Sequence, residues 1–101
     1  MKTITIKISE QSYTVSPFTY DQAIDAVDPI DAVSSGDLKR QIPAACTLIA
    51  MAISEHHPEM TEANLRAMRG PVDDLFDAVL AILKLNRYEA VSGKAPAAAA
   101  A

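Results

Sequence analysis

The stretch AACTLIAMAISEHH, Ala44 to His57, decides the fold, because only Thr47 interrupts its apolar run as far as Ile53. A helix that is apolar all round is buried in a core, crosses a membrane or faces a partner. No segment reaches the roughly 18 apolar residues that a bilayer span requires, so a membrane is not expected as a partner. The sequence therefore predicts a central helix that begins at Pro43 and ends near His56, before Pro58.

The N-terminal segment alternates between apolar and polar residues. Ile4, Ile6 and Ile8 lie on one face of an extended chain, and residues 12–16 alternate again after the polar link 9–11. Strict alternation with β-branched residues is typical of strands. The two segments predict a β-hairpin, which is marginal in water alone and must pack on the helices.

A second helix is predicted between the hairpin and the central helix. Thr19 can cap its first turn together with Gln22, and the pair Asp28-Pro29 is expected to end it. Three of its apolar residues share one face: Tyr20, Ile24 and Val27. A loop at residues 34–36 and a short turn at residues 37–41 follow.

Two helices are predicted after the central one. Thr61 caps the first, Glu62 to Arg69, and Pro71 takes the first position of the last helix. From Val72 the apolar residues recur at helical spacing, at positions 72, 75, 76, 79, 82 and 83. Acidic residues at its start and Lys84 near its end match the helix dipole.

The chain of 101 residues fits one domain. We predict an α+β fold in which the hairpin packs on a bundle of about four helices. This domain spans residues 1–88, and residues 89–101 form a disordered, Ala-rich tail with little to bury.

Charge and cysteine content limit the partners and the compartment. Acidic residues outnumber basic ones by 13 to 9, giving a net charge of −4 that repels nucleic acid. Residues 61–83 have helix-turn-helix proportions, but the second helix would bring Asp73, Asp74 and Asp77 to the DNA backbone. The lone Cys46 cannot form an internal disulfide, which indicates the cytoplasm.

The sequence predicts no catalytic, cofactor-binding or metal-binding residues. His56 and His57 point about 100° apart on a helix and cannot converge on one ion. Cys46 is expected to be an inert core thiol, and the three glycines do not form a phosphate loop. We therefore interpret the chain as a binding protein and not an enzyme.

The central helix is predicted to supply the binding site. The other elements are expected to cover about two thirds of residues 44–53, since each offers a single apolar face. The uncovered part is expected to form a protein-binding patch at Leu48, Met51, Ala52 and Ile53. The alternative is that the long helices pack tightly through their alanines and leave no patch.

The order of elements and the closing segment DDLFDAVLAILKLN, residues 73–86, resemble the small tail assembly chaperones of long-tailed bacteriophages. The resemblance covers residues 2–88. It implies a non-enzymatic protein of the host cytoplasm that binds the tape measure protein, keeps its apolar helices in solution and helps recruit tail tube subunits. Self-association is compatible with this role. The alternatives are an acidic adaptor or antitoxin-like regulator and, third, a helix-turn-helix DNA-binding protein.

Overall fold

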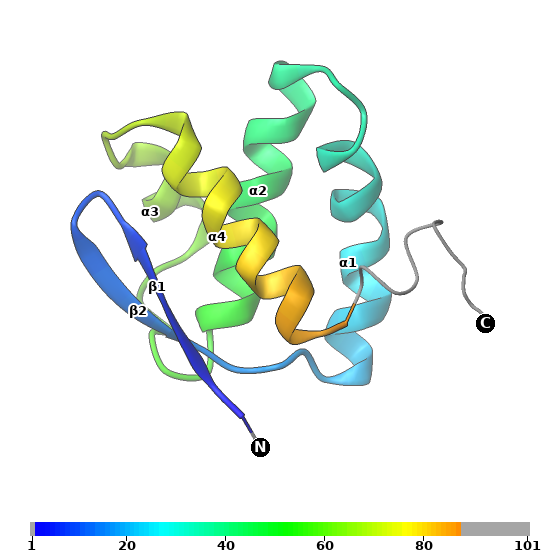
Figure 1. The fold of residues 1–101 in the computed structure, drawn as a ribbon, viewed down its shortest axis with the longest axis vertical. Helices are drawn as coiled ribbons and strands as arrows, with labels where there is room; N and C mark the ends of the chain where they lie inside the picture. Colours follow the sequence, from blue (N-terminus) through cyan, green and yellow to red (C-terminus); the bar gives the residue numbers. More distant parts are fainter. Residues whose placement is uncertain (1, 88–101) are drawn as a thin grey trace.

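The computed structural model describes residues 2–87; the predicted boundary at residue 88 and the tail at 89–101 lie outside them. A two-stranded antiparallel hairpin precedes four helices (Figure 1), which confirms the predicted α+β fold. The elements are β1 (Ile4–Ile8), β2 (Gln11–Val15), α1 (Tyr20–Val33), α2 (Leu38–Ile53), α3 (Glu62–Ala67) and α4 (Val72–Leu85). Among these helices, none is long and apolar enough to cross a membrane.

The hairpin packs one face on the helices. Ile6 pairs with Tyr13, and both side chains are buried together with Ile8 and Val15. The intervening side chains, such as Lys7, are exposed. The alternation in the sequence therefore corresponds to one face buried on the helices and one face in solvent.

The hairpin turn is held by the segment that leads into α4. Ser9 and Glu10 have φ values of 50° and 67°, the combination that a type I′ turn requires and that residues with a Cβ atom disfavour. The Ser9 N–H donates to Asp74 Oδ2 at 3.1 Å, and its hydroxyl donates to the Arg69 carbonyl. A Cβ atom on Gly70 would collide with Ser9 Oγ, so glycine is required for this close approach.

Helix α2 lies at the centre of the molecule, with α1 on one side, α3 on the other and α4 crossing in front of it (Figure 1). Strand β2 also contacts it, and the Ser16 N–H donates to the Ala52 carbonyl at 3.2 Å. Seven of its residues are buried: Ala44, Ala45, Cys46, Leu48, Ile49, Ala52 and Ile53. This arrangement explains the nearly continuous apolar run, because neighbours surround the helix.

Helix α1 continues through Pro29, so the predicted end at Asp28-Pro29 is wrong. The continuation places Ile30 and Val33 against the core, where both are partly buried. Burial of these side chains compensates for the hydrogen bond that proline removes. The predicted capping box at Thr19 and Gln22 is confirmed.

Helix α2 begins at Leu38 and ends at Ile53, so its predicted start at Pro43 and its end near His56 are both wrong. The predicted turn at residues 37–41 is its first part, and the Asp37 side chain caps it by accepting from the Lys39 N–H at 3.1 Å. Pro43 leaves the Lys39 carbonyl without a helical donor, but this end of the helix is exposed to water.

The boundaries of the last two helices differ slightly from the prediction. Thr61 caps α3 as predicted, since its hydroxyl accepts from the Asn64 N–H at 3.2 Å. Helix α3 ends at Ala67 and not at Arg69, and Pro71 is the N-cap of α4 and not its first helical residue.

Candidate protein-binding surface

The residues predicted to bind a partner lie in the core. Leu48 and Ile53 are 0% exposed, Ala52 is 2% exposed and Met51 is half-buried. The prediction that this segment leaves an exposed patch is therefore wrong. A partner cannot reach the side chains of Leu48, Ala52 and Ile53 unless the core opens.

Contacts from α1 and from the end of β2 reach the segment of α2 where the patch was predicted: Gln22 Nε2 donates to the Met51 carbonyl and the Ser16 N–H donates to the Ala52 carbonyl, both at 3.2 Å. Ile30 and Val33 lie beyond the predicted end of α1 at Asp28-Pro29, and they pack against the core near the start of α2, where Gln41 Nε2 donates to the Val33 carbonyl at 2.9 Å. Small side chains on α2, such as Ala45 and Ala52, allow its neighbours to approach closely. The alternative of tight packing through alanines describes the structure better.

Large apolar side chains are instead exposed on α1. Tyr20, Ile24 and Val27 are 91%, 69% and 61% exposed. Their spacing places them along one face of the helix, and Ala26, which is fully buried, lies on the other side. We call these three residues the α1 stripe.

An acidic row runs beside the α1 stripe. Asp21, Asp25 and Asp28 each follow a stripe residue by one position, so they lie about 100° further around the helix. All three are exposed. The two ion pairs recorded within residues 2–87 are His57–Glu59 and Arg66–Glu62, so neither involves the acidic row.

Sequence reasoning grouped Tyr20, Ile24 and Val27 correctly but did not identify them as the exposed face. The sequence signal that could have identified the exposed face was a second apolar face at positions 26, 30 and 33. This second face exists only if the helix runs through Pro29. Because that second face packs on α2, the first is left in solvent.

A groove of about 750 Å³ lies between β1, the hairpin turn and α4. Its charged residues are of both signs and include Lys7, Arg69, Asp74 and Asp77. Asp74 already accepts a hydrogen bond from the Ser9 N–H. Asp74 therefore connects the turn to α4.

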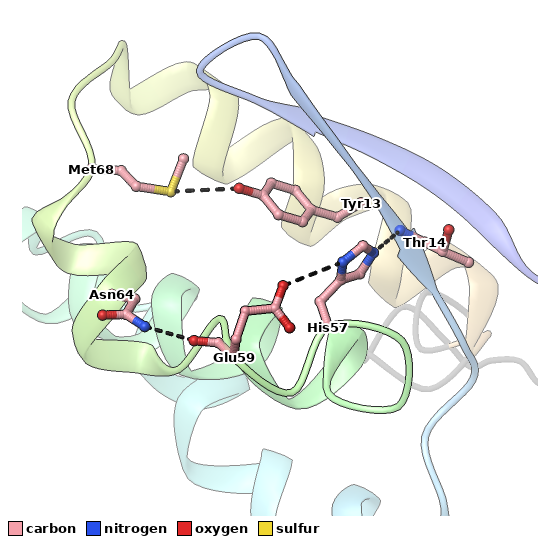
Figure 2. A network of polar contacts seen from close by, with 6 residues as sticks. All are labelled: Tyr13, Thr14, His57, Glu59, Asn64 and Met68. Atoms are coloured by element: carbon pink, nitrogen blue, oxygen red, sulfur yellow. Dashed lines mark hydrogen bonds and ion pairs between the residues drawn. The ribbon is translucent and has the colours of Figure 1, made fainter.

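His57 attaches the segment after α2 to the hairpin (Figure 2). Its Nε2 accepts from the Thr14 N–H at 3.0 Å, and its Nδ1 lies 3.9 Å from Glu59 Oε2. The Tyr13 ring meets the imidazole edge-on, with centroids 5.2 Å apart. Since Nε2 accepts a hydrogen bond, the ring proton of neutral His57 is on Nδ1 and faces Glu59.

His56 has a different hydrogen-bond partner from His57: its Nε2 lies 2.9 Å from Ser16 Oγ. The Tyr13 hydroxyl also donates to the Met68 sulfur at 3.9 Å (Figure 2). Within residues 2–87, no three His, Cys, Asp or Glu side chains gather to hold a metal ion. The two histidines therefore have structural partners on the strand β2 side.

Cys46 is 1% exposed, which confirms its predicted place in the core. Burial raises the pKa of its thiol; the Glu62 carboxylate adds to the rise and Arg66 opposes it. A buried thiol held in its neutral form is a poor nucleophile.

No family model, curated protein or solved structure matched the chain in the comparisons with known proteins. We therefore base the proposed function on the surface of residues 2–87 and on the order of the elements.

Proposed function

We propose that the chain is a non-enzymatic tail assembly chaperone of a long-tailed bacteriophage. It binds helical segments of the tape measure protein in the host cytoplasm and aids assembly of the tail tube. The observation that carries this proposal is the α1 stripe. Its large apolar side chains are exposed to solvent, whereas other large apolar side chains of the fold are buried in a core. Exposed apolar faces of this kind bind apolar faces of other proteins.

The rest of the molecule supports the same role. The resemblance to tail assembly chaperones depends on the order of a hairpin, a long apolar helix, a short helix and a closing helix. The net charge of −4 opposes self-aggregation of a protein that exposes apolar side chains.

Co-expression with the tape measure protein of the phage that encodes this chain tests the proposal. We expect the parent chain to move the tape measure protein from the insoluble to the soluble fraction and to co-purify with it. Leu48→Asp is the control for folding, because a carboxylate at this fully buried position unfolds the domain. A tape measure protein that is equally insoluble with the parent chain and without it would contradict the proposal.

A further inference from the structure

The α1 stripe is not required for the packing of α1. The helix packs mainly against α2, through the side that carries Ala26, Ile30 and Val33. Figure 1 shows α1 at the edge of the molecule, with α2 between it and α3. Among residues 2–87, the stripe on its other side is therefore a helix face without a packing partner, and it spans about two turns.

Three of the four charges of α1 are also not explained by helix stability, since only Asp21 lies in the first turn, where the helix dipole favours negative charge. The helix carries four aspartates and no lysine or arginine. Asp31 lies in the last turn, where the helix dipole disfavours negative charge and no basic residue offsets it, and Asp28 lies well outside the first turn, where the dipole would favour it. Within residues 2–87, neither forms an ion pair. The charge of this face thus suits a basic partner.

A second copy of the chain fits this face poorly. Two α1 helices that met through their stripes would bring two acidic rows to one interface, and like charges in an interface disfavour association. A helix with a row of Lys or Arg beside its own apolar stripe offers the complementary pattern: apolar side chains meet the stripe, and the basic row meets Asp21, Asp25 and Asp28.

We propose that the outer face of α1 is the docking site for an amphipathic helix whose apolar stripe is bordered by Lys or Arg. The proposal deepens the proposed function, on which it rests for the source of that helix: a basic amphipathic segment of the tape measure protein. Tyr20, Ile24 and Val27 lie on successive turns and bind the apolar side chains of the partner helix, and the acidic row selects the charge and the orientation.

The first test uses designed peptides and the full ¹⁵N-labelled chain. The probe is a helical peptide of about five turns with a leucine stripe bordered by lysine, and its partner control carries glutamate in place of lysine. We expect the lysine peptide to shift amide resonances over α1, with an affinity that falls as salt is added, and the glutamate peptide to bind at least about tenfold more weakly. Equal binding of both peptides, or no shifts over α1, would overturn the proposal.

The second test uses matched variants. Ile24→Lys places a cation in the stripe, and Leu80→Lys makes the same type of change at a position on α4 that is 58% exposed. We expect Ile24→Lys to weaken binding of the lysine peptide on the order of tenfold or more, and Leu80→Lys to leave it within about twofold of the parent. The reverse order would place the docking site on α4.

Co-expression of both variants with the tape measure protein separates this proposal from the proposed function. If the parent chain and Ile24→Lys keep the tape measure protein equally soluble, the docking site is wrong while the chaperone function stands. If the lysine peptide binds α1 but the parent chain leaves the tape measure protein insoluble, the chaperone function is wrong while the docking site stands.

Discussion

The enclosure of α2 predicts different effects for two matched truncations. Leu48→Ala and Ile24→Ala each shorten a branched aliphatic side chain inside a helix. Leu48 is 0% exposed, whereas Ile24 is 69% exposed. The two variants therefore differ in burial much more than in chemistry.

Leu48→Ala removes three buried carbon atoms, which costs about 2.4 kcal/mol at about 0.8 kcal/mol for each. A residual cavity of roughly 50 Å³ adds about 1.2 kcal/mol, so the free energy of unfolding falls by about 3.5 kcal/mol. Ile24→Ala introduces a better helix former at an exposed site, and its effect stays within about 0.5 kcal/mol.

Urea unfolding followed by far-UV circular dichroism measures both values, with equal m-values as the check on two-state behaviour. A loss below about 1 kcal/mol for Leu48→Ala, or above about 2 kcal/mol for Ile24→Ala, would show that the buried and exposed helix faces are assigned wrongly. The same reasoning makes Leu48→Asp a folding control, because its loss of binding follows from loss of the core.

Three further predictions concern the hairpin turn and the core. Glu10→Gly relieves a positive φ of 67° and should raise the free energy of unfolding by about 1 kcal/mol in urea titrations; a loss would refute this account of the turn. Gly70→Ala should lower the free energy of unfolding by about 1–2 kcal/mol. In a double-mutant cycle, adding Ser9→Ala, which removes the colliding Oγ, should recover part of that loss. Strictly additive losses would exclude the collision. Burial raises the pKa of the Cys46 thiol above 9.0, its ordinary value, so the folded state holds the thiol proton more tightly than the unfolded state does. The resulting contribution to the free energy of unfolding is present below pH 9.0 and declines above it. The parent should therefore lose stability more steeply than Cys46→Ala above pH 9.0, and identical alkaline slopes would contradict the shift.

Local sequence signals predicted the elements that depend on local physics. Alternating isoleucines defined β1, and the capping pair Thr19 and Gln22 marked the start of α1. Thr61 marked the start of α3 in the same way. These features follow from side-chain alternation and from backbone donors near the cap, so neighbouring residues are sufficient to predict them.

Long-range packing decided the features that the sequence did not predict. Pro29 and Pro43 are local signals for a helix boundary, yet both lie inside helices. Burial of residues such as Ile30 outweighs the hydrogen bond lost at Pro29, and at Pro43 the carbonyl left without a helical donor is exposed to water. The patch predicted on α2 is absent for a similar long-range reason, because α1, α3, α4 and β2 all contact this helix and leave Leu48 0% exposed. The binding surface could be found only when the inner face of α1 was known.

Hydrogen exchange on the complex with the tape measure protein tests the central claim most directly. We predict that binding slows exchange of the backbone amides of residues 20–27, while residues 44–53, most of which are buried in the free chain, exchange as before. Changed exchange at residues 44–53 with unchanged exchange at residues 20–27 would contradict the claim, because it would show that the partner opens the core and does not dock on the outer face of α1.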